Sequence, residues 1–332
     1  MRLSGKAFKV LKRGYYMNLP ELKIGKLVAQ VPIMQGGMAI RLSTAPLAAA
    51  VANEGGIGLI AASGMGLDEL RKEIRMAREL TGGKGIIGIN AMVAARQFLD
   101  LITTAAEEGI DLIVAGAGFS RDIFAVGKQY GVEVVPIVSS ARLAQTAEKL
   151  GASAVVVEGT EAGGHLGTQQ SIKEILPEVI AAVNIPVIAA GGAIDGNDVA
   201  ELLKLGANGV QMGSRFAASE ESNAAPALKE FYLKMTQEDI VQIDSPVGYK
   251  GRAIRNPFAQ LSLEDKSPKP TQCDACLKKC KRNFCIIRAL TRAQQGDTET
   301  GLIFTGANMW KIKEILPIKE IFRRIKEEIA NI

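Results

Sequence analysis

The sequence predicts an α/β fold, a (β/α)8 TIM barrel closed by eight parallel strands. Short apolar runs begin near residues 31, 57, 86, 112, 133, 154, 186 and 209, about twenty to thirty residues apart. Most of these runs precede a stretch with helical periodicity, and alternation of strands with helices is typical of a parallel sheet. Several runs are almost continuously apolar, as expected for strands that helices cover. Eight such units fit a barrel with ligand groups on the loops after its strands. An open doubly wound sheet is the alternative that periodicity leaves open.

The helices expected between these strands are marked by residues at their ends. Ser43 and Thr44 precede an alanine-rich helix that Gly55 and Gly56 end, and hydroxyls before a helix with glycine after it are the usual signals. The predicted helices of the barrel lie near residues 43–55, 67–80, 96–108, 121–130, 139–151, 171–183 and 195–205.

The alternation of strands and helices stops after residue 215. The remaining segments are predicted as a helix near 224–236, an irregular stretch with four prolines at 240–270, a short basic helix near 284–295 and an amphipathic helix at 317–330. We interpret 1–219 and 301–332 as the barrel with its terminal arm and closing helix. Residues 220–300 then form an excursion, or lid, over the barrel mouth.

Composition and charge exclude several classes of protein. Hydrophobic residues make up 47% and charged residues 23%, as in ordinary globular chains. No apolar run reaches about 18 residues, so no membrane span is expected, and residues 1–22 lack the apolar core of a secretory signal. The net charge of +5 is local, because residues 250–292 carry +8 and the remainder −3. The basic excess therefore does not predict a nucleic-acid partner.

A polar, glycine-rich loop with two acids follows the strand that ends at Val157. Glu158, Gly163 and Gly164 lie in this loop with His165, the only histidine in 332 residues. Loops that follow rigid strands often carry ligand sites, and the ordinary pKa of histidine suits proton transfer near neutrality. We predict that His165 is catalytic, with a structural histidine as the alternative.

Two glycine-containing turns end the last two predicted strands. Gly191 and Gly192 follow one strand, and Gly213 and Ser214 follow the next. In barrels of this class, the loops after strands seven and eight often bind phosphate through backbone N–H groups. Gly192 would let the backbone approach an anion, and Ser214 would add a hydroxyl. The simpler interpretation is two tight turns and a helix cap.

Further polar groups are expected on the same face of the barrel. Gln35, Gly36, Gly37 and Met38 follow the first strand, and Asn90 ends the third. A flat conjugated ring with one phosphate tail needs amide and backbone donors around the ring and glycines for access, which describes FMN better than a dinucleotide. No GxGxxG follows a strand, as a Rossmann site would require.

Four cysteines lie within thirteen residues, at Cys273, Cys276, Cys280 and Cys285, and the rest of the chain contains none. This spacing predicts a metal site in a reducing compartment, and hence a cytoplasmic protein, rather than a disulfide framework. Four thiolates hold either tetrahedral zinc or an iron–sulfur cluster. We expect a 4Fe-4S cluster, with zinc and unmetallated thiols as the alternatives.

Several segments in this order carry a family resemblance: PIMQGGM, ANEGGIGLI, GIN at 88–90, VEGTEAGGHLG, IPVIAAGGAIDG and GVQMGSRF, with a looser match at GLIFTGANMWKI. They resemble the nitronate monooxygenase family, formerly called 2-nitropropane dioxygenases. The flavin-type enoyl-acyl-carrier-protein reductases share its fold and motifs. The resemblance covers about residues 20–219.

The resemblance implies a barrel with non-covalent FMN that oxidises alkyl nitronates with O2 through a flavin semiquinone. It implies His165 as base or electrostatic partner. The FMN contacts expected from the strand ends and the resemblance are Gln35, Gly36, Gly37, Met38, Asn90, Glu158, Gly163, Gly164, Gly191, Gly192, Gln211, Met212, Gly213 and Ser214. Two features depart from the family pattern: Ser214 replaces a frequent threonine, and the cysteines are not a feature of well-described members.

Two other functions remain open at this point. One is an FMN enzyme that reduces enoyl-acyl-carrier-protein or enoyl-CoA with NAD(P)H. The other is an iron–sulfur flavoprotein for electron transfer or redox sensing. A small-molecule substrate is expected in either enzyme, and NAD(P)H or a protein is the candidate electron donor. A homodimer is left open, and neither nucleic acid nor a membrane is expected as a partner.

Overall fold

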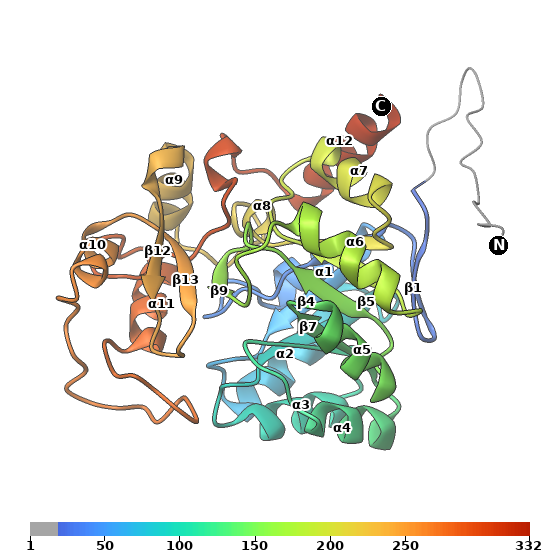
Figure 1. Cartoon of the computed structure of the whole chain (residues 1–332), viewed down its shortest axis with the longest axis horizontal. Helices are drawn as coiled ribbons and strands as arrows, with labels where there is room; N and C mark the ends of the chain where they lie inside the picture. Colours follow the sequence, from blue (N-terminus) through green and yellow to red (C-terminus); the bar gives the residue numbers. More distant parts are fainter. Residues whose placement is uncertain (1–18) are drawn as a thin grey trace.

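Eight parallel strands close into a barrel, as predicted (Figure 1). In the computed structural model, which describes residues 19–332, strand β11 returns to β3 with Gln211 opposite Met34. This closure excludes the open doubly wound sheet. In their order around the barrel, the strands are β3 (Ile33–Gln35), β4 (Ile57–Ala61), β5 (Ile86–Met92), β6 (Leu112–Gly116), β7 (Glu133–Val138), β8 (Val155–Glu158), β10 (Val187–Ala190) and β11 (Gly209–Met212).

Burial on both sides explains why the strands are apolar throughout. Every residue of β4, β6, β10 and β11 is buried. One set of side chains forms a single cluster with residues of nearly every strand, including Met34, Leu59, Val114, Val156 and Ile188. Their neighbours along the strands pack in two larger clusters together with helix residues. The barrel is therefore a packed core, and it offers ligand space only at its end.

Helices surround the barrel and begin where the sequence indicated. At the start of α6, Ser171 and Glu174 form a reciprocal capping box, and the Asp195 side chain accepts a hydrogen bond from the N–H of Asp198 in α7. The barrel helices are α1 (Ala45–Asn53), α2 (Leu67–Leu80), α3 (Phe98–Glu107), α4 (Asp122–Tyr130), α5 (Ala141–Lys149), α6 (Ile172–Ala182), α7 (Gly196–Lys204) and α8 (Ser214–Ala217).

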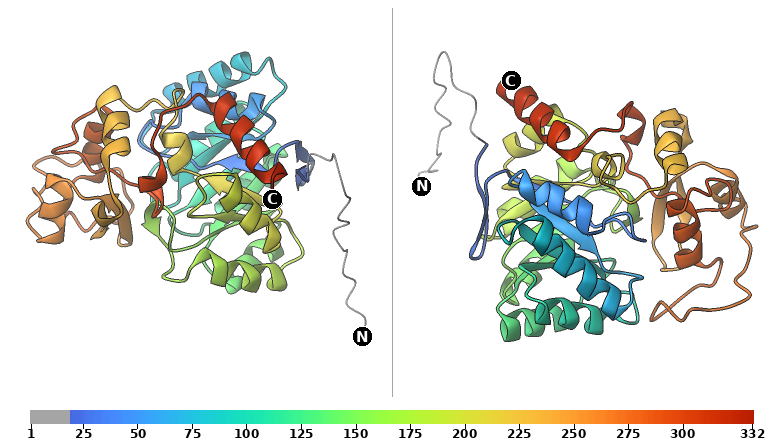
Figure 2. Two further views of the ribbon diagram at one scale, coloured as in Figure 1. Left: turned by 90° about the horizontal axis from the view of Figure 1, so that it is seen from above. Right: turned by 180° about the vertical axis from the view of Figure 1, so that it is seen from behind.

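The last helix of the chain, α12 (Ile318–Ala330), completes the ring. It packs against α7 and α1 (Figure 2). The fully buried ring of Phe322 stacks on Phe216 at a centroid distance of 5.9 Å. The Glu328 carboxylate accepts a hydrogen bond of 2.6 Å from the N–H of Gly196, at the start of α7. The predicted closing helix is confirmed.

Replacing Phe322 with alanine is expected to lower the free energy of unfolding by about 3–5 kcal/mol, because it leaves a cavity between α12 and the barrel. The matched control is Lys319→Ala, an exposed position on the same helix, which should change it by less than about 0.5 kcal/mol. Urea denaturation of both variants measures the difference. Equal losses in the two variants would contradict a core role for Phe322.

Beside the barrel, residues after α8 form a second group of elements (Figure 1). They are α9 (Pro226–Lys234), the 3-10 turn η1 (Gln237–Asp239), β12 (Ile240–Asp244), β13 (Lys250–Ile254), α10 (Pro257–Leu263), α11 (Ile286–Gln294) and the 3-10 turn η2 (Met309–Lys311). The predicted helices near 224–236 and 284–295 are confirmed. The prediction that 240–270 is irregular is wrong for 240–263. Its prolines misled it: Pro246 lies in a turn, and Pro257 opens α10, where proline is tolerated.

Besides the β12–β13 hairpin, two short antiparallel pairings were not predicted. The hairpin of β1 (Leu22–Ile24) and β2 (Leu27–Ala29) precedes the barrel. The second involves β9 (Gly164–Leu166), which lies in the loop after β8 and pairs with β13. The loop that carries His165 is therefore part of a three-stranded sheet, β12-β13-β9.

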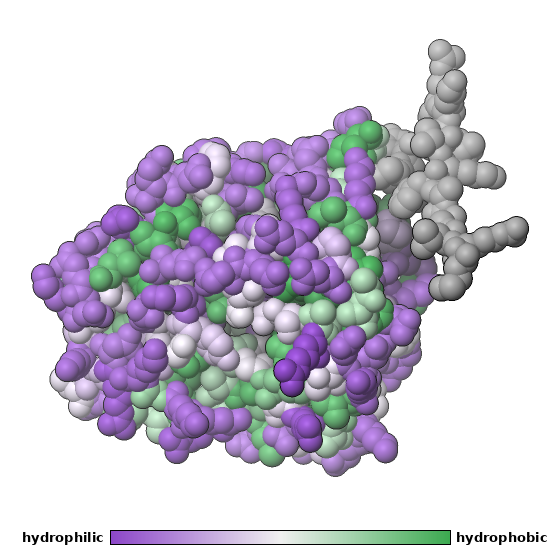
Figure 3. Space-filling model, in the orientation of Figure 1, coloured by the Kyte–Doolittle hydropathy of each residue, from purple (hydrophilic) through white to green (hydrophobic). Residues whose placement is uncertain are grey.

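Over residues 19–332, no helix has the length and apolar character needed to cross a membrane. The face in Figure 3 is largely hydrophilic, with small apolar areas between polar side chains. The expectation about a secretory signal concerns residues 1–22, of which 1–18 lie outside the described residues.

Candidate active site

A cavity of about 480 Å³ lies at the carboxyl ends of the barrel strands. This volume is within the usual range for small-molecule and cofactor sites. The cavity brings together nearly all the site residues predicted from the sequence, from five different strand ends. Those that line it are Gly36, Gly37, Met38, Asn90, Glu158, Gly163, Gly164, His165, Gly191, Gly192, Gln211, Gly213 and Ser214.

Two predicted contacts, Gln35 and Met212, do not line this cavity. Both side chains are buried elsewhere in the barrel. The Gln35 amide donates to the carbonyl of Leu59 (2.8 Å) and accepts from its N–H (3.3 Å). Strands β3 and β4 share a single register pair, Met34 with Ile57, so the Gln35 side chain extends their contact. We therefore interpret Gln35 as a residue that closes the barrel.

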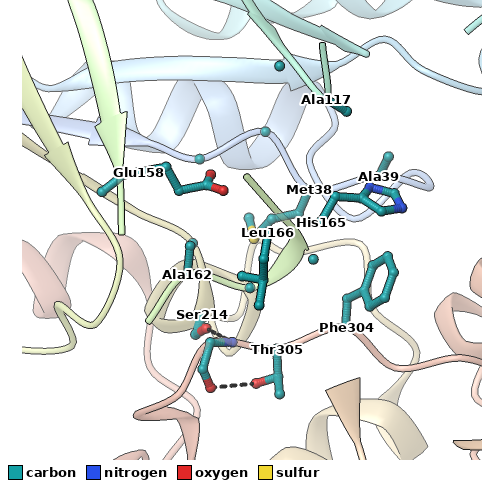
Figure 4. Close-up of a pocket in the computed structure, with 18 of the residues that line it drawn as sticks. Met38, Ala39, Ala117, Glu158, Ala162, His165, Leu166, Ser214, Phe304 and Thr305 are labelled. Atoms are coloured by element: carbon teal, nitrogen blue, oxygen red, sulfur yellow. Dashed lines mark hydrogen bonds between the residues drawn. The ribbon is translucent and has the colours of Figure 1, made fainter. Parts of the chain in front are cut away.

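The glycine turns after β10 and β11 form a concave wall. Gly191 and Gly192 have φ values of +112° and +86°, in the left-handed region that favours glycine. The returning segment 304–308 covers this wall: Asn308 donates to the carbonyl of Gly192 (2.7 Å), and the N–H of Gly306 donates to the Ser214 hydroxyl (2.9 Å; Figure 4). The Ser214 hydroxyl can still donate its own hydrogen to a ligand.

One buried acceptor faces this cavity without a partner. Gln211 is 9% exposed, and its Oε1 accepts no hydrogen bond from any described residue. Such orphaned groups are rare and call for a ligand or water. An N–H at the edge of a flavin ring would satisfy Gln211, and the glycine turns would admit the phosphate tail. The residues present therefore fit FMN.

The two acids of the predicted loop have different environments. Burial raises the pKa of Glu158 to about 8, so near pH 7 its carboxyl is neutral and can donate a hydrogen bond. Glu161 instead accepts hydrogen bonds from the Ser171 hydroxyl (2.6 Å) and from the N–H of Ile172 (2.9 Å). Both acids line the cavity, and the Glu161 carboxylate also holds the start of α6.

His165 lies across the cavity from Glu158 (Figure 4). Its Nε2 is 2.8 Å from the Ser245 hydroxyl, and its ring meets the Phe304 ring edge-to-face at a centroid distance of 5.2 Å. Burial lowers its pKa to about 4. Near neutral pH the imidazole is therefore uncharged. One ring nitrogen can donate a hydrogen bond and the other can accept one, but the ring lacks the second proton of an imidazolium.

Sequence reasoning missed the residues that hold His165 from outside the barrel. Ser245 follows β12, and Phe304 belongs to the segment that returns from α11 to the barrel. Asn308 of the same segment, which bonds Gly192, was missed as well. The alternation in VQID and GRAI, separated by a turn with Pro246 and Gly248, was an available signal for the hairpin. Nothing in the local pattern shows that this hairpin pairs with β9.

The metal centre predicted at Cys273, Cys276, Cys280 and Cys285 is not formed. Among residues 19–332, no three His, Cys, Asp or Glu side chains are placed to hold a metal ion. The physical reason is that 264–285 contains no helix and no strand beyond a single bridge between Leu277 and Ala95. Burial, together with the nearby Cys285, Cys280 and Cys273, raises the pKa of Cys276 to about 11. The thiols thus lie in one region, but this loop does not bring three of them to the distances of a metal site. The structure supports neither a 4Fe-4S cluster nor zinc, nor an iron–sulfur electron-transfer role.

The stability of the cofactor-free protein is expected to fall as pH rises from about 6.5 to about 8. In this window the folded chain keeps a proton on Glu158 that the unfolded chain, with an ordinary glutamate pKa of 4.5, has lost. The lowered pKa of His165 acts in the opposite sense, but only between about 4 and 6.5. Thermal melts across this window should show the fall in wild type and its absence in Glu158→Gln. Parallel melting curves for the two proteins would refute the assignment.

The closed barrel, with its cavity at the strand ends and an uncharged histidine in the cavity wall, defines a (β/α)8-barrel enzyme. Sequence comparison identifies the group within this class. The chain belongs to the nitronate monooxygenase family, whose sequence model matches residues 21–114 and 92–328. The resemblance noted from its motifs is confirmed.

Three similar proteins illustrate the range of this family. A dehydrogenase of Mycobacterium tuberculosis, named for (3aS,4S,5R,7aS)-5-hydroxy-7a-methyl-1-oxo-octahydro-1H-indene-4-carboxyl-CoA, is 33% identical over 232 residues. That alignment covers 69% of this chain and 64% of the relative, less than two thirds of its length. A probable nitronate monooxygenase of Staphylococcus aureus (strain MSSA476) is 30% identical, with coverages of 70% and 78%. FabK from Thermotoga maritima has a TM-score of 0.80 and 35% identity, with coverages of 90% and 93%.

Proposed function

We propose that this protein is an FMN-dependent oxidoreductase that oxidises alkyl nitronates with O2. The observation that carries the proposal is the single cavity that combines a glycine wall, the unpartnered Gln211 acceptor and the uncharged His165. Family membership supports it. The alignment covers only 64% of the Mycobacterium relative, so that protein's substrate is not transferred to this chain.

The cavity residues divide the binding of FMN among them. The phosphate would lie at the turns of Gly191–Gly192 and Gly213–Ser214, where the backbone N–H groups and the Ser214 hydroxyl donate. The ring would pair with Gln211 and Asn90, and the segment Gly36–Met38 would lie beneath it. When bound, FMN supplies the ring that accepts the substrate's electrons.

The remaining residues orient the substrate and exclude water. A nitronate is an anion with two oxygen acceptors, so it needs donors and a site with little competing water. His165 and the neutral carboxyl of Glu158 lie on opposite sides of the cavity and can both donate. Phe304 packs edge-to-face on the His165 ring and would limit the access of water to it.

Anaerobic mixing with an alkyl nitronate tests the proposal. We expect the visible absorbance of oxidised flavin to fall on mixing and to recover when oxygen is admitted. Absence of any change in the flavin spectrum across a range of alkyl nitronates would refute the nitronate substrate, even if the protein binds FMN.

A second candidate function is NAD(P)H-dependent reduction of an enoyl thioester. A specific observation favours it: the cavity extends into an apolar region between α9 and α11, lined by Leu228, Tyr232, Ile286, Ile287 and Leu290. A small nitronate would leave this region empty, whereas an acyl chain would fill it. NADPH consumption with crotonyl-CoA distinguishes the two.

We also propose that residues 220–300 act as a lid on the barrel formed by 1–219 and 301–332. Side chains of α9 and α11 line the cavity, and β13 pairs with β9. The excursion therefore supplies walls of the site that the barrel strands do not provide.

A further inference from the structure

We propose that Ser245 fixes His165 as the tautomer protonated on Nδ1, so that the histidine faces the ligand as a hydrogen-bond donor and not as a base. The geometry assigns Ser245 as a positioning residue, because it acts through His165. The chemical consequence rests on the proposed function, whereas the tautomer itself follows from the protein alone.

The hydrogen bonds of Ser245 determine which ring nitrogen of His165 carries the proton. This residue is fully buried. Its hydroxyl oxygen accepts from the N–H of Val247 (3.3 Å) and lies 2.8 Å from Nε2 of His165. Among the described residues, Nε2 is the one acceptor within reach of the hydroxyl hydrogen. If Nε2 carried a proton, the oxygen would accept twice and this hydrogen would stay unpaired in a buried site, which is costly.

The other ring nitrogen of His165, Nδ1, is available to a ligand. Since Nε2 accepts from Ser245, the neutral ring must carry its proton on Nδ1. No described residue forms a hydrogen bond with Nδ1, and this atom is not among the buried unpartnered atoms. His165 lines the cavity. The Nδ1–H group therefore retains access to a ligand.

Neighbouring strands and turns hold His165 and Ser245 in place. His165 lies opposite Gly251 in the β9–β13 pairing, and a side chain at Gly251 would come within 2.8 Å of the Phe304 ring that packs on His165. The N–H of Ser245 donates to the carbonyl of Tyr249 (3.0 Å), which fixes the turn after β12.

The segment with the cysteines fixes this turn from the other side. The N–H of Lys281 donates to the carbonyl of Pro246 (2.9 Å), and the Asn283 amide donates to the carbonyl of Asp244 (2.8 Å). Ser245 is thus held between two bonded neighbours in the chain. Its buried hydroxyl is bonded to His165 and to the N–H of Val247.

A donor at this position suits an oxygen on which negative charge is located or develops. Nitronate oxygens and a thioester carbonyl both meet this description, so the inference applies to either candidate substrate. A neutral imidazole donor adds no net charge to the site, and a fixed donor needs no reorganisation when the substrate charge changes. Proton abstraction by His165 is not part of this proposal.

Nitrogen-15 NMR of the histidine ring tests the tautomer directly. His165 is the only histidine in the chain, so protein labelled with [15N]histidine and made without a histidine tag gives one ring spin system. In the FMN-loaded enzyme at neutral pH, we expect a protonated Nδ1 and an unprotonated Nε2. A protonated Nε2, or a mixture of the two tautomers, would overturn the proposal.

Variants separate positioning from packing. Ser245→Ala should yield a tautomer mixture and lower kcat by about 10- to 100-fold, whereas Ser245→Thr keeps the hydroxyl and should keep the wild-type spectrum. Ser262→Ala, a buried serine of α10 away from the cavity, is the control and should change neither. A wild-type spectrum in Ser245→Ala would contradict the role. The NMR result needs no substrate, so it stands or falls separately from the proposed reaction.

Discussion

His165→Ala is expected to lower kcat by about 10²- to 10³-fold, the scale for loss of one fixed hydrogen-bond donor, while FMN stays bound. The variant removes the one ring that faces the cavity between Ser245 and Phe304, but it leaves the glycine turns and Gln211 intact. Steady-state kinetics with the accepted substrate, together with flavin absorbance of the purified variant, measure the two effects separately.

His165→Asn is the informative partner of this variant. Its side-chain NH2 lies close to where Nδ1–H lies in histidine, so a donor role predicts partial recovery of kcat over the alanine variant. A base role predicts no recovery, because an amide does not take up a proton near neutral pH. Unchanged turnover in His165→Ala would mean that His165 has only a structural role.

Gly192→Val is expected to weaken FMN binding by roughly 10- to 100-fold, on the scale of backbone strain at a single residue. Gly192 has a φ of +86°, and a Cβ there would lie 3.3 Å from Cβ of Glu161 and 3.4 Å from Nδ2 of Asn308. A β-branched residue would shift the turn that receives the phosphate. Titration of flavin-free protein with FMN, followed by fluorescence, gives the dissociation constants.

Gly151→Val is the matched control for this experiment. Gly151 has a similar φ of +94°, but a Cβ there meets nothing within 4 Å, and the residue does not line the cavity. Both variants carry the backbone strain, and only Gly192→Val should lose affinity for FMN. Equal affinities in the two proteins would count against the phosphate position.

The sequence predicted the barrel well because its signals are local. Each strand is a short apolar run with its own helix, and the glycine turns follow the strand ends directly. Since the carboxyl ends of parallel strands meet at one end of a barrel, residues as distant as Asn90 and Ser214 could be assigned to one site without knowledge of any contact between them. Both line the cavity.

Other features are not determined by local patterns. Gln35 and Met212 stand at strand ends, where the sequence does not show which way a side chain points, and both point away from the cavity. The three residues of β9 are too few for a periodic signal, and their partner strand begins at Lys250. The spacing of the cysteines gives their separation along the sequence, whereas a metal site requires their thiols to meet in three dimensions.

The order in which the chain emerges from the ribosome sets when the enzyme can become complete. All eight barrel strands have been synthesised by Met212, yet Ser245 and β13 follow later, and α12 ends at Ala330. Until α12 is made, α7 and α1 lack their neighbour, and until β13 is made His165 lacks the strand that fixes it. The site and its supporting helix are therefore complete only after α12 has been synthesised. A nascent chain arrested before α12 would expose to chaperones the apolar surface of α7 and α1 that α12 covers.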